Sequence, residues 1–149
     1  MTRSDRLEPI ANLQRDKEIK ATQVLGEAQR RYLAHERRLA DLEQFQREYQ
    51  QRFQSLGRSG ATIDRFKEYR HFNERLNDAI QQQKKLLEEC RHELEQQSRY
   101  WSEVRSKRSA LDKVIDRFRC EETSHARRRE QRESDDRAQR MRPLIDGEG

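Results

Sequence analysis

The chain has 149 residues, of which 41% are charged and only 31% are hydrophobic. This apolar content is too small for a compact globular core but sufficient for a linear seam between helices, so pocket-forming classes of protein are disfavoured. The 33 basic and 28 acidic side chains leave a net charge of +5, and the two signs are interspersed along the chain as on a solvated helical surface.

A first helix is predicted over residues 9–56, because Pro9 suits a first helical turn, where its missing N–H is not needed. Two stripes interleave along this segment by steps of three and four residues. They are Leu25, Tyr32, Leu39, Gln46 and Phe53, and Ala21, Ala28, His35, Leu42, Tyr49 and Leu56. This spacing places both stripes on one helical face and indicates a coiled-coil seam.

Residues 57–61 interrupt the pattern with two closely spaced glycines. Gly57 is predicted to end the first helix in a left-handed conformation, and Thr62 is predicted to cap the next helix. A short loop between two long amphipathic helices turns the chain back on itself. We therefore expect an antiparallel hairpin.

A second, longer helix is predicted over residues 62–142, ending before Pro143 and followed by a short disordered tail. Its 3-4 stripe is unbroken from Phe66 to His125. The stripe is Phe66, Tyr69, Asn73, Leu76, Ile80, Gln83, Leu87, Cys90, Leu94, Gln97, Trp101, Val104, Arg108, Leu111, Ile115, Phe118, Glu122 and His125. The expected fold is all-α, an antiparallel two-helix coiled-coil hairpin forming a single domain over residues 1–149.

The two predicted helices differ in length, so part of the second should lack a partner. Pairing outward from the loop places Leu13 opposite Arg105, and everything beyond about Lys113 is then expected to project past the first helix. Ile115 and Phe118 would leave apolar positions uncovered there. Exposed apolar stripes of this kind favour a binding partner.

No catalytic or cofactor motif is present: the chain lacks a phosphate-binding loop, a dinucleotide turn and a nucleophile elbow. The four histidines lack metal-ligand spacing, so we expect no enzyme activity, cofactor, metal or small-molecule substrate. Arg127–Arg129 is the most basic run, but acidic residues follow it at once, and no nucleic acid is expected. The absence of a membrane-spanning run and of a signal-peptide core favours a cytoplasmic location.

Aromatic residues gather beside the loop, where residues 45–72 hold six of the ten in the chain. Some of them exceed what a two-helix seam requires. Two rows would lie side by side in the hairpin: Arg38, Leu42, Phe45 and Tyr49, and Phe72, Leu76, Ala79 and Gln83. These rows are compatible with a well-packed tip and equally with a docking surface, because exposed aromatic clusters favour partner contacts.

From about Leu7 to Arg140 the chain resembles the flagellar FliJ proteins. The resemblance rests on the segments 24–27 and 39–49, on the short glycine loop and on the Trp101 region. It also rests on Tyr69, Phe72, Leu76, Ala79 and Ile80.

This resemblance implies a hairpin similar to the central stalk of rotary ATPases. It further implies a cytoplasmic component of the flagellar type III export apparatus, peripherally associated with the inner membrane, whose partners are the hexameric export ATPase, the export-gate membrane protein and export chaperones. The two rows correspond to the family's gate-contacting surface, although Arg38, Phe45 and Gln83 depart from the commoner pattern. The part that enters the ATPase ring would lie around residues 10–30 and 100–140. The alternatives are a nucleic-acid-associated or a self-assembling structural coiled coil.

Overall fold

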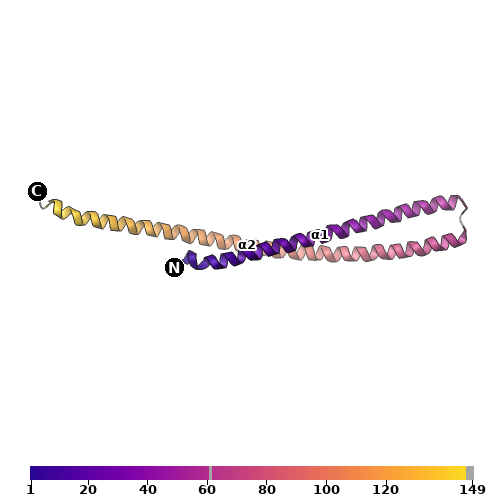
Figure 1. Cartoon of the computed structure of the whole chain (residues 1–149), viewed down its shortest axis with the longest axis horizontal. Coiled ribbons are helices and arrows are strands. Elements are labelled where there is room, and N and C mark those ends of the chain that lie inside the picture. The colour runs from indigo at the N-terminus through magenta and orange to yellow at the C-terminus, as the bar shows by residue number, and fades with distance from the viewer. Residues whose placement is uncertain (61, 147–149) are drawn as a thin grey trace. The chain divides into compact units, whose positions relative to one another are not determined.

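The computed structural model describes the backbone of residues 1–60 and 62–146 and the side chains up to Met141. Two helices account for almost all of it: α1 spans Arg3–Arg58 and α2 spans Ile63–Asp146 (Figure 1). The chain divides into two compact units that each contain a piece of both helices. Unit 1 comprises Met1–Ile19 and Glu103–Gly149, and unit 2 comprises Lys20–Ser102.

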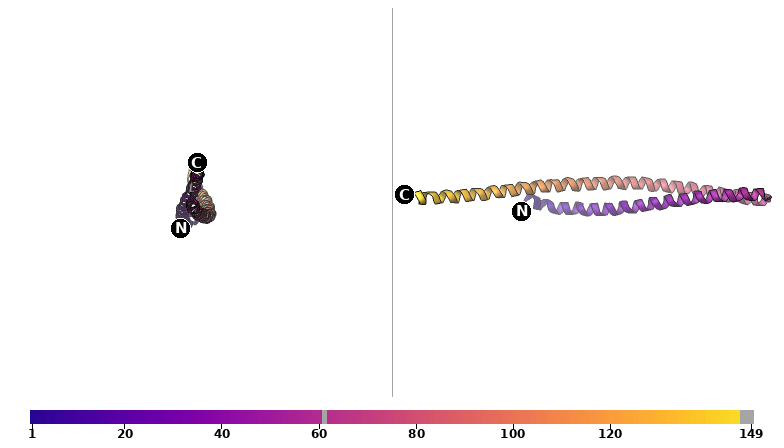
Figure 2. Two further views of the ribbon diagram at one scale, coloured as in Figure 1. Left: turned by 90° about the vertical axis from the view of Figure 1, so that its right-hand side faces the viewer. Right: turned by 90° about the horizontal axis from the view of Figure 1, so that it is seen from above.

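In unit 2 the two helices run side by side in opposite directions from the turn that joins them, as both views of the ribbon show (Figures 1 and 2). This arrangement confirms the predicted all-α, antiparallel two-helix hairpin, and α2, with 84 residues against 56 in α1, is the longer helix. The prediction of a single domain over residues 1–149 stays a prediction.

Helix α1 begins at Arg3, six residues before the predicted start at Pro9. Thr2 and Asp5 explain the earlier start, because they form a reciprocal capping arrangement. The Asp5 N–H donates to Thr2 Oγ1 at 3.2 Å, and the Thr2 N–H donates to the Asp5 carboxylate at 3.3 Å. These bonds satisfy amide groups that a helix start leaves without partners. Pro9 therefore lies inside α1, where it removes one backbone hydrogen bond.

The turn also differs in detail from the prediction. Gly57 is helical, and the left-handed conformation belongs to Gly60, whose φ is +84°. The end of α1 is closed by Ser59, whose N–H and hydroxyl both donate to the Leu56 carbonyl oxygen, at 3.1 and 2.9 Å. These bonds tighten the last turn of α1, so the helix continues past residue 56 and the reversal falls on Gly60. Ala61, the last residue of the predicted loop, lies outside the described residues.

Helix α2 ends at Asp146 and not at residue 142. Pro143 falls in its last turn, where the missing N–H costs only one hydrogen bond. Residues 147–149, the end of the predicted tail, lie outside the described residues.

The seam of unit 2 follows the predicted stripes. Ala21 and Ala28 of α1 and Leu76 and Ile80 of α2 are buried. Small residues on one helix let the other approach closely, so that larger side chains fill the space between the axes. The stripe of α2 is at least half-buried from Tyr69 through Glu122, which confirms the 3-4 repeat over that range, whereas Phe66 and His125 are exposed.

Polar residues in the seam of unit 2 make specific bonds between the helices. Gln83 is 5% exposed, and its Nε2 donates to the His35 carbonyl oxygen at 3.0 Å and lies 3.0 Å from His35 Nδ1. Trp101 Nε1 donates to Thr22 Oγ1 at 3.0 Å. Because a side-chain hydrogen bond of this kind can form in only one alignment of the two helices, such pairs favour a single register.

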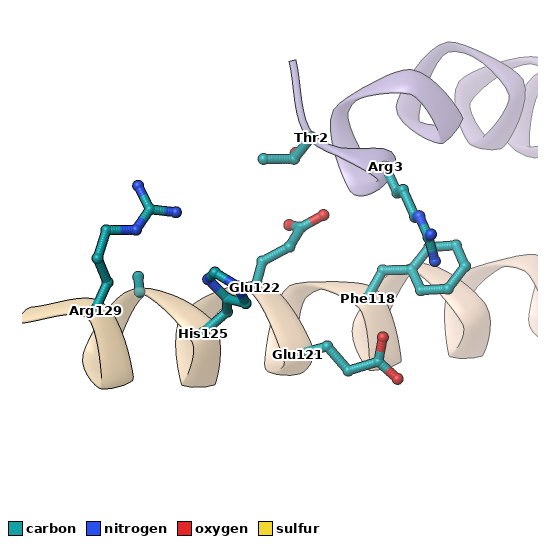
Figure 3. Close-up of a pocket in the computed structure, with 8 residues that line it drawn as sticks. Thr2, Arg3, Phe118, Glu121, Glu122, His125 and Arg129 are labelled. Carbon is teal, nitrogen blue, oxygen red and sulfur yellow. The ribbon is translucent and has the colours of Figure 1, made fainter. Parts of the chain in front are cut away.

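In unit 1 the start of α1 lies against α2 at Phe118 and Glu122 (Figure 3). The Ser4 N–H and hydroxyl donate to the two oxygens of the Glu122 carboxylate, at 3.1 and 2.7 Å. These bonds to Ser4 hold the pKa of Glu122 below its ordinary value of 4.5. The Arg3 guanidinium lies 5.7 Å from the centroid of the Phe118 ring. The first turn of α1 is therefore anchored by charge-assisted bonds and by a cation–π contact.

Ion pairs follow the seam of unit 1. Arg108 lies on the stripe of α2 and pairs with Glu18 of α1 and with Asp112, and these two carboxylates raise its pKa above the ordinary value. Arg15 pairs with the same Asp112 at 3.3 Å, and Arg119 pairs with Glu8 at 2.7 Å. The carboxylates and cations are partly exposed, so the network fixes alignment more than it adds stability.

The predicted overhang begins too early. Arg15 pairs with Asp112, so Leu13 lies further along α2 than Arg105. Ile115 is 2% exposed, and Phe118 is half-buried. The earlier start of α1 supplies their cover. Uncovered helix begins only after Glu122, and residues 123–141 are all exposed. The stripe continues there as His125, Arg129, Arg132, Asp136 and Gln139, so this part of α2 offers no apolar seam.

The buried Gln83 provides a test of the seam. Gln83→Ala removes the bonds to His35 and leaves a gap, so we expect the free energy of unfolding of the full chain to fall by about 1–3 kcal/mol. Urea unfolding followed by circular dichroism measures this loss. The exposed neighbour Gln82 is the matched control, and Gln82→Ala should change stability by less than about 0.5 kcal/mol. Equal effects of the two substitutions would contradict the register.

The Glu122 contact provides a pH test. Since the folded pKa of Glu122 is lowered, its stabilising contribution is complete above the unfolded value of 4.5 and is lost as pH falls through the lowered pKa. The protection factors of the amides of residues 3–8, which compare each exchange rate with that of an unfolded chain at the same pH, should therefore fall at acidic pH, while those of Leu76 and Ile80 do not. Glu122→Gln should produce this loss of protection already at neutral pH. Identical protection of residues 3–8 in that variant would show that Ser4 does not depend on the carboxylate.

Candidate functional site: an aromatic cluster in unit 2

Six aromatic rings form a continuous cluster near the turn of unit 2. Phe53 and Tyr69 are stacked with their ring centroids 3.6 Å apart, and Tyr49 stacks on Tyr69 at 5.0 Å. Phe66 meets Phe53 edge-on at 4.9 Å. The cluster consists of Phe45, Tyr49, Phe53, Phe66, Tyr69 and Phe72.

The seam spacing explains four of these rings. Tyr49 and Phe53 lie on the stripe of α1, and Phe66 and Tyr69 lie on that of α2. Burial among the rings raises the pKa of the Tyr69 hydroxyl, and Tyr49 adds to the effect. Each ring pair of this kind contributes roughly 0.5–1.5 kcal/mol beyond the area that it buries, so the cluster holds the tip of the hairpin together.

The other two rings lie on the flank. Phe72 packs on Tyr49 with a centroid distance of 4.4 Å, and Phe45 meets Phe72 edge-on at 6.0 Å. Phe45 also stacks on Tyr49 at 6.3 Å and remains 44% exposed. The structure therefore brings the two predicted rows together at Phe45, Tyr49 and Phe72.

The eight residues of the two rows differ in accessibility. Arg38 and Phe45 are exposed, whereas Leu76 and Gln83 are buried. The remaining four are half-buried: Leu42, Tyr49, Phe72 and Ala79. A binding partner could contact Arg38 and Phe45 directly and the four half-buried residues along their exposed edges. The two buried residues would not be contacted and instead hold the residues above them in position.

Asn77 is a residue of this region that the sequence pattern does not reveal. It lies off the stripe of α2, yet its side chain accepts a hydrogen bond from Gln46 of α1. The sequence contains one indirect indication of this bond: Gln46 is a polar residue at a seam position and needs a hydrogen-bonding partner on the other helix. The spacing alone does not identify Asn77 as that partner. This bond links the helices within the span of the two rows, since Gln46 follows Phe45 and Asn77 follows Leu76.

Two grooves flank the Phe53–Tyr69 stack at the end of the hairpin. The first is lined by Tyr49, Arg52, Phe53, Leu56, Arg65, Glu68 and Tyr69. The second is lined by Phe53, Ile63, Phe66, Lys67, Tyr69, Arg70 and Asn73. Both combine an apolar floor with two cationic side chains. They are open hollows on the surface, unlike the enclosed pockets in which small-molecule chemistry takes place.

Other kinds of site are not found in the part of the chain that the structure describes. Over these residues, no group of three or more His, Cys, Asp or Glu side chains could hold a metal ion. Neither helix contains, within its described residues, a stretch long and apolar enough to cross a membrane.

Comparison with known protein families identifies a relationship. The family described as "Flagellar FliJ protein" matches residues 3–142, which is nearly the whole chain. No curated protein and no solved structure matches it. The family is a non-catalytic component of flagellar protein export, and its members have protein partners in the export apparatus. The helical hairpin is consistent with this match, and the chain belongs to the flagellar FliJ family.

Proposed function

We propose that this chain is a non-enzymatic stalk or adaptor of the flagellar type III export apparatus, and that the two rows in unit 2 bind the export-gate membrane protein. The observation that carries the proposal is the position of Phe45. Phe45 is 44% exposed, but its ring is held by contacts with Tyr49 and Phe72. An exposed aromatic side chain that is already held in place loses little entropy on binding, which favours its use as an anchor.

The surroundings of Phe45 suit a protein interface. Leu42 and Ala79 add half-buried apolar surface, and Arg38 adds an exposed cation at the end of its row. Interfaces commonly combine such an apolar centre with a charged rim, where the charges affect the rate of encounter more than the affinity. Leu76 and Gln83 are buried under this surface and contribute by fixing the positions of the residues that form it.

The other partners belong to the same proposal. We expect the hexameric export ATPase and export chaperones to bind elsewhere on the chain. Residues 123–141 of unit 1 are candidates, because they are exposed throughout and offer charged side chains of both signs. The chain would act in the cytoplasm, associated with the inner membrane through the export apparatus. The acidic residues that follow Arg127–Arg129 disfavour nucleic acid as a partner.

A single substitution tests the gate surface. Phe45→Ala removes the exposed anchor and leaves the seam intact, so binding to the purified cytoplasmic part of the export-gate protein should weaken by roughly tenfold or more. Tyr49→Ala combined with Phe72→Ala should abolish binding and motility. Isothermal titration with the full chain measures affinity, and circular dichroism verifies that each variant remains helical.

Leu33 supplies the matched control, because it is 61% exposed on the same helix of unit 2 but lies outside both rows. Leu33→Ala should leave gate binding unchanged. The proposal fails if Phe45→Ala binds as tightly as Leu33→Ala, or if both variants lose affinity equally.

A further inference from the structure

The end of the hairpin in unit 2 exposes apolar side chains that lie outside the two rows. Ile63 is 74% exposed, Phe66 is 42% exposed and Leu56 is 41% exposed. Single exposed apolar residues are ordinary on a protein surface, but these three gather around one turn. Leu56 and Ile63 belong to none of the aromatic pairs that close the seam, and Phe66 remains exposed although it packs against Phe53. Packing within the hairpin therefore leaves apolar surface of all three residues open to a partner.

Positive charge concentrates at the same place. Residues 50–71 contain five cationic and two anionic side chains, whereas the chain as a whole has 33 and 28. Three of the five excess positive charges of the protein therefore fall in this short segment. The cations are Arg52, Arg58, Arg65, Lys67 and Arg70, and all five are exposed.

These cations are available for an external anion. In the described part of the tip, no carboxylate forms an ion pair with any of the five. Arg91 in the same unit shows the contrast, because it pairs with both Glu88 and Glu95. Each of the two grooves beside the Phe53–Tyr69 stack is bordered by two of the five cations.

We propose that the end of the hairpin, defined by Leu56, Arg58, Ile63, Arg65, Phe66 and Lys67, docks on an anionic phospholipid surface. The three apolar side chains would enter the boundary between headgroups and acyl chains, and the arginines and the lysine would bind lipid phosphates around them. Exposed apolar residues surrounded by cations are the combination that binds peripheral proteins to anionic membranes. This surface is distinct from the two rows, so it adds a lipid contact to the proposed gate contact and does not depend on it.

Vesicle binding by the full chain tests the proposal. Phosphatidylcholine vesicles that contain phosphatidylglycerol should co-sediment the protein at low salt, and vesicles of phosphatidylcholine alone should not. High salt should release the protein, because exposed charges are screened. Absence of binding to the anionic vesicles would overturn the proposal and leave an acidic protein surface as the partner of the tip.

Two pairs of substitutions locate the contact. Arg58→Gln with Arg65→Gln should weaken partitioning by about fivefold for each charge removed. Leu56→Ser with Ile63→Ser should weaken it by on the order of tenfold, through lost apolar burial. The matched control is Leu33→Ser with Arg37→Gln, which removes an exposed apolar residue and an exposed cation elsewhere in unit 2. It should bind as the unaltered chain does.

Substituting the other basic run separates a specific contact from simple charge attraction. The variant in which Arg127–Arg129 are all replaced by glutamine should still bind the vesicles. The proposal is wrong if that variant loses binding while the tip variants retain it.

A fluorescent reporter gives an independent measurement. Phe66→Trp should show a blue-shifted emission on anionic vesicles, measured against the unaltered chain with its single Trp101. An unchanged spectrum would mean that the tip does not enter the lipid. Gate binding is measured without lipid, so failure here leaves that proposal standing.

Discussion

Side-chain burial along one 3-4 stripe of each helix is the interaction on which the rest of this protein depends. A chain that is 41% charged has no other means of burying apolar surface. In both units the buried positions fall on this stripe, with Ala28 and Ile80 in unit 2 and Ala11 and Ile115 in unit 1. Because the seam occupies only one face of each helix, the remaining faces stay free for partners. The function of such a protein therefore depends on which side chains its outer faces present to partners and on how rigidly the seam keeps those side chains in place.

The seam has different chemistry in the two units. Near the turn it is aromatic, and rings such as Phe53 and Tyr69 pack on one another. In unit 1 it is interrupted by the Arg108–Glu18 ion pair, and the first turn of α1 depends on the Glu122 carboxylate. Aromatic packing is little affected by salt or pH, whereas exposed ion pairs are sensitive to both. We therefore expect the aromatic end to hold its surface rigidly and the start of α1 to open more readily.

The helical hairpin and its seam could be predicted from the sequence, because a 3-4 repeat sustained over many turns places its residues on one face of a helix that packs against another helix. The predicted start of α1 is wrong because Pro9 also suits a first helical turn, although Thr2 and Asp5 have the spacing of a capping box and form its bonds in the structure. The uncovered part of α2 was misplaced as a consequence. For the candidate site, periodicity predicted which residues share a row. It also separated the buried Gln83, which lies on the stripe, from the exposed Phe45, which lies on the flank. It could not show which rings meet, because that depends on how the side chains are oriented.

The central claim is that the exposed aromatic flank of unit 2 meets the export apparatus directly. The most direct measurement places a photoreactive benzophenone side chain at position 45 of the full chain in motile cells and identifies the protein that becomes cross-linked on irradiation. Position 33, exposed on the same helix, receives the same group as the control. Our account predicts a cross-link to the export-gate protein from position 45 and none from position 33. Equal cross-linking from the two positions, or a gate cross-link from position 33 alone, would contradict it.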